Sequence, residues 1–268
     1  MDFQFKDKYD FNDLVEIVRY LRLPDGCPWD KEQTHKSVRQ DLIEETYEVV
    51  EAIDNDDMTA LREELGDVLL QVVFHTQIER EKGTFDMNDV ANDVCQKMIT
   101  RHPHVFGEVK ADTTEQVLDN WDKIKMQTKS QTTQTDALKS ISRSLPSLMR
   151  SQKIQKKAAK VGFDFPTPDE AAVKVTEELT ELINAVHAGD ENDIAEEAGD
   201  LLFAAVNVVR LAGANGEKAL YDACDKFISR FSLVEQLVRE SGKNFDDYSL
   251  SELDSFWDQA KDSSEPID

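Results

Sequence analysis

An acidic pattern occurs twice in this chain at one constant offset. Residues 44–48 (EETYE) are followed by residues 63–67 (EELGD), and the arrangement recurs as residues 177–181 (EELTE) and 196–200 (EEAGD). The pattern reads EExxE, a gap of fifteen residues and ExxD, and each acid of the second copy lies 133 positions after its counterpart. Recurrence over such a length is typical of a duplicated structural unit. We therefore predict two tandem copies of one domain, residues 1–134 and residues 135–268.

Both copies have the apolar spacing of helices. Glycine and proline are scarce, at 10 and 7 of 268 residues, and the apolar residues recur every three or four positions. We predict an all-α protein in which each acidic pattern spans a helical hairpin of a four-helix type. The predicted helices are residues 36–53 and 59–81 in the first copy, and residues 168–187 and 194–212 in the second. Residues 127–135, rich in Gln, Thr, Ser and Lys, predict an exposed linker.

Counting along the second hairpin brings its four acids together. If the turn centres near Gly189, Glu181 and Glu197 each lie eight residues away, or about 12 Å along the helix. Glu178 and Asp200 each lie eleven residues away, or about 16 Å. Acids three residues apart share a helix face, so the four carboxylates meet in two facing tiers. The same count about a turn near Asp56 gives the corresponding set in the first copy: Glu45, Glu48, Glu64 and Asp67.

Carboxylates at this density point to a bound cation. They repel one another unless they are protonated or neutralised. A set with only oxygen donors favours Mg²⁺, with Mn²⁺ as a substitute, over zinc. A single acidic helix pair is typical of a solvated face, but the duplication at matched heights favours a metal site. A ferritin-like di-iron site would need Glu-x-x-His pairs, which neither acidic hairpin contains. Because Mg²⁺ often shares its coordination with substrate phosphates, we expect phosphoryl or nucleotidyl chemistry.

A phosphate-bearing substrate also needs positive charge and groups that contact the rest of the molecule. The cation candidates are Lys174, Lys226 and Arg230, since lysine and arginine bind phosphate. Trp257 is a candidate for stacking on a base, and Asn207 for hydrogen bonding to a base or sugar edge. The first copy has Phe74 where the second has Asn207, so the two sites differ chemically. Glu177 and Glu196, each next to a predicted ligand, are candidates for the general base or for a second metal shell.

Composition and charge exclude several classes of partner. Lysine and arginine number 31 against 55 acids, a net charge of −24, which argues against non-specific binding to nucleic acid or an anionic membrane. No apolar run approaches the roughly 20 residues of a membrane span, and the N-terminus lacks a signal-peptide pattern. We therefore expect a cytoplasmic protein. The three cysteines lack metal-type spacing and fit reduced thiols.

The chain resembles the MazG family of nucleoside triphosphate pyrophosphohydrolases, within the all-α NTP pyrophosphatase superfamily. The acidic pattern alone is typical of the superfamily, and the resemblance covers nearly the whole chain. Beyond the acids it rests on GCPWDKEQTH at residues 26–35, RHPHVFG at 101–107, LPSLMR at 145–150, QKIQK at 152–156 and VGFD at 161–164.

The resemblance implies Mg²⁺-dependent attack of water on the α-phosphorus of a nucleoside triphosphate, giving the monophosphate and pyrophosphate, for nucleotide sanitation or a stress response. It implies that magnesium is held by Glu178, Glu181, Glu197 and Asp200, and that the nucleotide contacts Lys174, Lys226, Arg230 and Trp257. It also implies a homodimer. We expect the second copy to be the active one, because it alone has Asn207. The alternatives are a narrower dUTP or dCTP pyrophosphatase and a helical regulatory protein that binds nucleotide without turnover.

Overall fold

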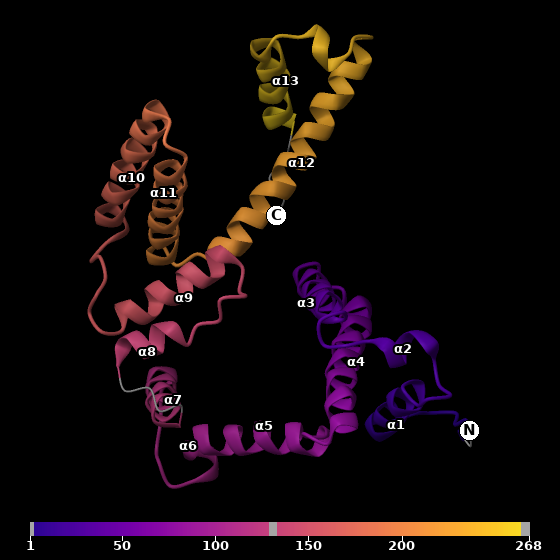
Figure 1. Ribbon diagram of the computed structural model, residues 1–268. Helices are drawn as coiled ribbons and strands as arrows, with labels where there is room; N and C mark the ends of the chain where they lie inside the picture. The colour runs from indigo at the N-terminus through magenta and orange to yellow at the C-terminus, as the bar shows by residue number, and fades with distance from the viewer. Residues whose placement is uncertain (1–2, 129–132, 264–268) are drawn as a thin grey trace. The chain divides into compact units, whose positions relative to one another are not determined.

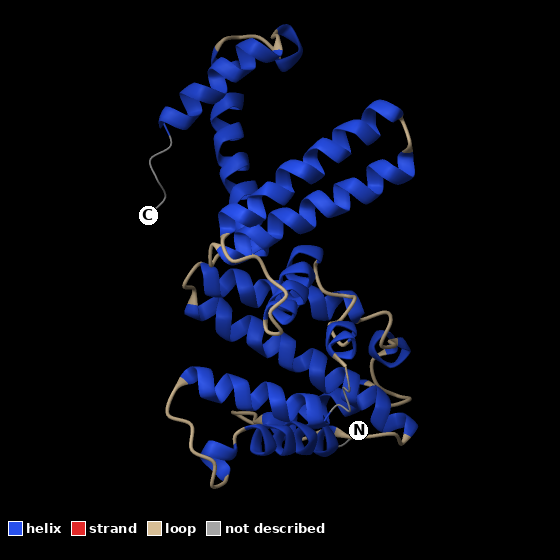
Figure 2. Cartoon of the chain, turned by 90° about the vertical axis from the view of Figure 1, so that its left-hand side faces the viewer, coloured by secondary structure: helices blue, strands red, loops and turns tan. Residues whose placement is uncertain are grey.

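The described part of the chain is entirely helical. The computed structural model describes residues 3–128 and 133–263. Over these residues the chain forms thirteen α-helices and one 3₁₀ helix, and it has no strand (Figure 2). The predicted all-α class is confirmed. Among the helices so described, none has an apolar stretch long enough to cross a membrane.

The chain divides into two compact units, Met1–Lys125 and Met126–Asp268. The division falls inside α7 (Thr114–Thr128), ahead of residue 134, where the sequence places the domain boundary. That domain boundary stays a prediction. Each unit contains one of the two acidic hairpins.

The first unit is built around the hairpin of α3 (Arg39–Asp54) and α4 (Met58–Lys82), which lie side by side (Figure 1). α1 (Phe11–Leu21) packs on α4, and a core of apolar side chains forms where they meet. The core residues are Val18, Val38, Val73, Phe74 and Ile78. The remaining helices are α2 (Pro28–Glu32), α5 (Met87–Arg101), α6 (Pro103–Phe106) and the greater part of α7.

The second unit repeats the hairpin as α10 (Pro168–Ala188) and α11 (Glu191–Leu211), which pack along their length (Figure 1). α9 (Ser147–Ala159) packs on α11, and α8 (Gln134–Lys139) packs on α9. α12 (Gly216–Glu240) follows the hairpin and pairs with α13 (Leu250–Ser263), with the 3₁₀ helix Phe245–Asp247 between them. A second apolar cluster at Val234, Val238 and Ala260 joins α12 to α13.

Both hairpins turn through aspartate caps. Asp57 accepts hydrogen bonds from the backbone N–H groups of Thr59 and Ala60 at the start of α4. Asp190 does the same at the start of α11, where Gly189 closes α10 in the left-handed conformation with φ +76°. These caps satisfy N–H groups that have no partner inside the helix. They fix the turns about which the heights of the acids are counted.

The expected linker over residues 127–135 is wrong at both ends. Gln127 and Thr128 complete α7, and Gln134 and Thr135 begin α8. Thr133 caps α8 by accepting a hydrogen bond from the backbone N–H of Asp136. Polar composition marks exposure, but glutamine and lysine also have good helix propensity, so such a segment can be helical. Residues 129–132 of the expected linker lie outside the described residues.

Candidate active site

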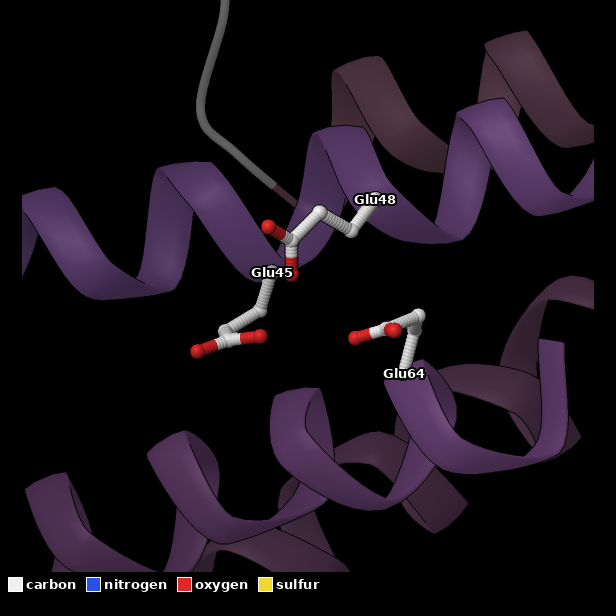
Figure 3. A group of neighbouring side chains, drawn as sticks. All are labelled: Glu45, Glu48 and Glu64. Carbon is white, nitrogen blue, oxygen red and sulfur yellow. The ribbon is translucent and has the colours of Figure 1, made fainter. Parts of the chain in front are cut away.

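The first hairpin brings three carboxylates into the space between α3 and α4. Glu45 and Glu48 lie one turn apart on α3, and Glu64 faces them from α4 (Figure 3). One oxygen of each lies within 4.8 Å of the others. Asp67, one turn further along α4, is outside this trio, although its charge acts on Glu45.

The second hairpin also forms a trio, with a different membership. Glu178 on α10 and Glu197 and Asp200 on α11 have carboxylate oxygens within 4.8 Å of one another. Glu181 is exposed and lies outside the trio, yet its charge is the largest carboxylate influence on Glu197. Each copy thus gathers three of its four predicted acids and keeps the fourth within electrostatic reach.

Several of these carboxyl groups are shifted toward the protonated form. The pKa values of Glu45, Glu64 and Glu197 are raised above the ordinary glutamate value, first by burial and then by the neighbouring carboxylates. A bound cation would remove this repulsion. Oxygen donors alone, from carboxylates that converge on one point, suit a hard divalent cation such as Mg²⁺. Both trios therefore fit a metal centre by their donor chemistry.

Lys174 places positive charge beside the second trio. Its Nζ lies 2.8 Å from Glu177 Oε1 and 3.0 Å from Glu178 Oε1, and these hydrogen bonds raise the lysine pKa. The corresponding residue of the first copy, 133 positions earlier, is Asp41, which adds negative charge. The two copies therefore share their acids but differ in the charge that an approaching phosphate would meet.

A cavity of about 680 Å³ opens beside the second trio. Its lining includes Lys174, Glu178 and Asp200, together with Asn207 two turns further along α11. The rest of the lining comes from α8, α9, α10, α11 and the segment after α9, and it is mainly apolar: Leu138, Ile154, Gln155, Ala158, Gly162, Phe163, Asp164, Phe165, Ala171, Phe203 and Ala204. Paired carboxylates and a cation thus border a space with apolar walls.

Asn207 is held in one orientation within this lining. Its Oδ1 accepts hydrogen bonds from Arg210 Nε at 3.1 Å and from Arg210 Nη2 at 2.7 Å. Arg210, in turn, forms an ion pair with Asp164 from the segment after α9. In the first copy the counterpart Phe74 is buried in the core, and Gln71 stands where the second copy has the cavity-lining Ala204. At these positions the second copy lines the cavity with a small side chain and an amide, whereas the first copy has a larger amide, Gln71, and the buried ring of Phe74.

The structure does not bring the other predicted nucleotide contacts to this cavity. Lys226 and Arg230 lie on α12, and Trp257 lies on α13. The Trp257 ring packs 5.0 Å from Phe227, between ring centroids, and against the apolar cluster that joins the two helices. A tryptophan on an amphipathic helix buries its ring against its nearest apolar partner, which here is α12. Contact of these three residues with nucleotide stays a prediction.

Several lining residues were not singled out from the sequence. They are Gln155, Phe163, Phe165 and Phe203. Gln155 and Phe163 lie in the segments QKIQK and VGFD, which were noted only as part of a resemblance. The sequence signal that could have found them is the pair of phenylalanines on either side of Asp164, directly after Gly162. In the structure Gly162 has φ +84°, and a turn of this kind can direct the side chains that follow it toward a cavity.

Comparisons with known proteins agree with this geometry. The profile of the MazG nucleotide pyrophosphohydrolase domain matches residues 33–106 and 167–234, which include both acidic hairpins. The chain is 44% identical over 251 residues to the nucleoside triphosphate pyrophosphohydrolase of Escherichia coli (strain K12), covering 92% of this chain and 95% of that protein. It is 44% identical over 253 residues to the nucleoside triphosphate pyrophosphohydrolase/pyrophosphatase MazG of Thermotoga maritima, covering 94% and 95%. It is also 45% identical over 255 residues to the uncharacterized protein YabN of Bacillus subtilis, covering 95% of this chain and 52% of that protein.

Proposed function

The chain belongs to the MazG family and is a nucleoside triphosphate pyrophosphohydrolase, and from this premise we propose that its second copy carries a Mg²⁺-dependent active site. In the proposed reaction, water forms a bond to the α-phosphorus and the bond from that phosphorus to the bridging oxygen breaks. The products are a nucleoside monophosphate and pyrophosphate. The proposed substrates are canonical or aberrant ribo- and deoxyribonucleoside triphosphates, and the proposed role is nucleotide-pool sanitation or a stress response.

The observation that carries this proposal is the cavity beside the second trio. Its volume of about 680 Å³ lies within the roughly 300–1,000 Å³ of small-molecule sites. Glu178, Asp200 and Lys174 all line it, so a ligand in the cavity meets two acids of the trio and a positive charge. Such a combination suits a polyphosphate chain attached to a less polar group.

Each residue has a role that follows from its position. Glu178, Glu197 and Asp200, with Glu181 beside them, would hold the Mg²⁺. When bound, Mg²⁺ neutralises charge on the phosphates and on the departing pyrophosphate. Lys174 would exchange its ion pairs with Glu177 and Glu178 for a phosphate oxygen.

The proton of the attacking water needs a carboxylate that is not consumed by metal binding. Glu177 and Glu196 are adjacent to metal ligands and exposed, so they are the two candidates. Glu177 is the one that the structure connects to the cavity, through its ion pair with the cavity-lining Lys174. We therefore propose Glu177 as the general base, and it is the first of the two candidates to test.

We also propose that two chains associate through the hairpin of the second unit. Large apolar side chains are exposed on both of its helices in the single chain, which is unfavourable in water unless they are covered. They are Leu179, Ile183, Val186 and Leu202. Light scattering after size-exclusion chromatography should give the mass of a dimer, and Ile183→Glu should shift it toward a monomer.

The proposed reaction is tested by product analysis with a panel of ribo- and deoxyribonucleoside triphosphates in H₂¹⁸O, with and without Mg²⁺. Attack at the α-phosphorus places the label in the nucleoside monophosphate and releases pyrophosphate. Label in the pyrophosphate, or release of orthophosphate, would contradict the proposed site of attack. Turnover of dUTP or dCTP alone would establish the narrower substrate class.

A further inference from the structure

One buried hydrogen-bond acceptor in the cavity has no partner. Gln155 on α9 lines the cavity and is only 7% exposed. Its Nε2 donates a hydrogen bond of 2.7 Å to the backbone carbonyl of Phe203 on α11. Its Oε1 is buried and, among the described residues, has no hydrogen-bond partner. A buried polar atom in this state costs free energy, so such an atom calls for an explanation.

The orientation of this amide is fixed by its other contact. If Gln155 were turned over, its oxygen would face the Phe203 carbonyl oxygen, and two acceptors would oppose each other. The acceptor oxygen is therefore the end that remains for a ligand in the cavity. What it requires from that ligand is an N–H or O–H donor.

A neighbouring glutamine on α9 has both ends of its amide paired, so burial on this helix does not by itself leave the oxygen unpaired. Gln152 lies nearly one turn earlier on the same helix and is 8% exposed. Its Nε2 donates to the carbonyl of Ala214 at 2.8 Å, and its Oε1 accepts from the N–H of Gly216 at 3.1 Å. Both ends of Gln152 thus tie α9 to the chain around the start of α12, and Gln152 does not line the cavity. Gln152 therefore has a structural role, whereas the Oε1 of Gln155 has no hydrogen-bond partner among the described residues.

Asn207 supplies the complementary donor. Because Arg210 donates twice to Asn207 Oδ1, the amide Nδ2 is the end of Asn207 left to donate. The cavity therefore offers a fixed acceptor from Gln155 and a fixed donor from Asn207. Phe163, Phe165 and Phe203 add aromatic surface to the same lining. An acceptor, a donor and aromatic rings together match the edge and face of a nucleobase.

Building on the proposed function, we propose that Gln155 determines specificity by accepting a hydrogen bond from an N–H group on the edge of the nucleobase. Asn207 donates to a base acceptor on the same edge. The N–H is either the exocyclic amino group of adenine or cytosine, or the ring N–H of uracil, thymine or guanine. The exocyclic amino group and the ring N–H each provide the N–H donor that Gln155 Oε1 requires.

Substrate pairs that differ in this donor test the proposal. ATP is compared with purine riboside triphosphate, which lacks the amino group, and UTP with N3-methyluridine triphosphate, which lacks the ring N–H. In the wild type we expect one pair to differ by at least about 10-fold in kcat/KM, since sites built around a hydrogen bond reject analogues that lack it. Which pair differs identifies the source of the N–H. Equal kcat/KM in both pairs would overturn the proposal.

Matched variants then assign the discrimination to Gln155. Gln155→Met should bring the discriminating pair to within about 2-fold, whereas Gln152→Met should keep the wild-type ratio even if it lowers the melting temperature. An unchanged ratio in Gln155→Met would overturn the proposal.

Asn207→Asp provides a nearly isosteric second variant. It keeps the side-chain oxygen that accepts from Arg210 and replaces the Nδ2 donor with a second oxygen. It should lower kcat/KM by about 10-fold for every base without a change in melting temperature, and an unchanged kcat/KM would also count against the site.

Binding of the monophosphates separates this proposal from the proposed function. Calorimetric titration with AMP and purine riboside monophosphate, and with UMP and its N3-methyl analogue, needs no turnover. If no triphosphate is hydrolysed but one pair of monophosphates still differs in the wild type and not in Gln155→Met, the proposed reaction fails and the base contact stands. If triphosphates are hydrolysed but neither pair differs, the reverse holds.

Discussion

At the scale of single residues, Lys174 is a cation that the structure places beside the second trio. We predict that Lys174→Met lowers kcat/KM for nucleoside triphosphates by about 10- to 100-fold, because a hydrogen bond to a charged group contributes about 1.5–3 kcal/mol. Lys174→Arg should recover part of the loss, since it keeps the charge. Steady-state kinetics of the three proteins measures this. Kinetics of Lys174→Met equal to those of the wild type would remove Lys174 from the site.

Glu79 in the first unit gives a prediction about acid stability. Lys82, Thr84 and His35 lower its pKa from 4.5 to about 2, and the Lys82 and His35 nitrogens each lie 2.6 Å from Glu79 Oε1. Because the pKa is lower in the folded state, the stabilisation is present above pH 4.5 and is lost as the pH falls toward 2.

The variant Glu79→Gln should therefore flatten the decline in stability between these pH values, measured by urea unfolding followed by circular dichroism. Glu51→Gln, at an exposed position of the same unit, is the control. If the free energy of unfolding of Glu79→Gln falls with decreasing pH as steeply as that of the wild type, this cluster does not couple folding to pH.

The residues that sequence reasoning found and missed differ in a physical way. The acids were found because their spacing on two helices fixes where they meet, and this spacing can be read directly from the sequence. Gln155 was missed because its importance depends on one unpaired oxygen, which a sequence cannot show. Trp257 and Arg230 were predicted from their chemistry to contact nucleotide, and this contact stays a prediction, because their positions depend on how α12 packs against α13 at Val234 and Val238.

At the scale of elements, the turn of the second hairpin holds the acids of α10 and α11 at matching heights. Asp190 Oδ1 accepts hydrogen bonds from the backbone N–H groups of Asn192 and Asp193 at 2.9 and 3.3 Å. Asp190→Ala should lower the free energy of unfolding by about 1 kcal/mol, while Asp190→Asn, which keeps a capping oxygen, should cost much less. Chemical denaturation of the two variants checks this. Equal losses in both would mean that the cap does not stabilise the hairpin.

The same turns explain why the long helices could be predicted. The four hairpin helices were expected within three residues of their observed ends, because apolar periodicity defines their interiors and Asp57, Asp190 and Gly189 mark their limits. The short helices α2, α6 and α8 have five, four and six residues, too few to display a period. For the same reason the polar residues 127–135 predicted a linker where part of the segment is helical.

At the scale of the whole molecule, the chain carries two similar acid groups in different surroundings, and matched substitutions can decide which one is catalytic. Glu64 and Glu197 occupy equivalent positions, and each belongs to its trio. Lys174 and the cavity lie beside the second trio, whereas the first copy has Asp41 and the buried Phe74 at the positions equivalent to Lys174 and Asn207. Glu197→Gln should therefore lower kcat by at least about 100-fold, since the charge stabilisation that a metal supplies amounts to several kcal/mol. Glu64→Gln should stay within about 2-fold of the wild type, and the double variant should match Glu197→Gln.

Loss with Glu64→Gln alone would place catalysis in the first copy, and loss only in the double variant would mean two working sites. Because both substitutions remove one like charge from a repelling group at equivalent positions, a difference between them in activity reflects how each trio and its surroundings are arranged, and not the loss of a charge as such.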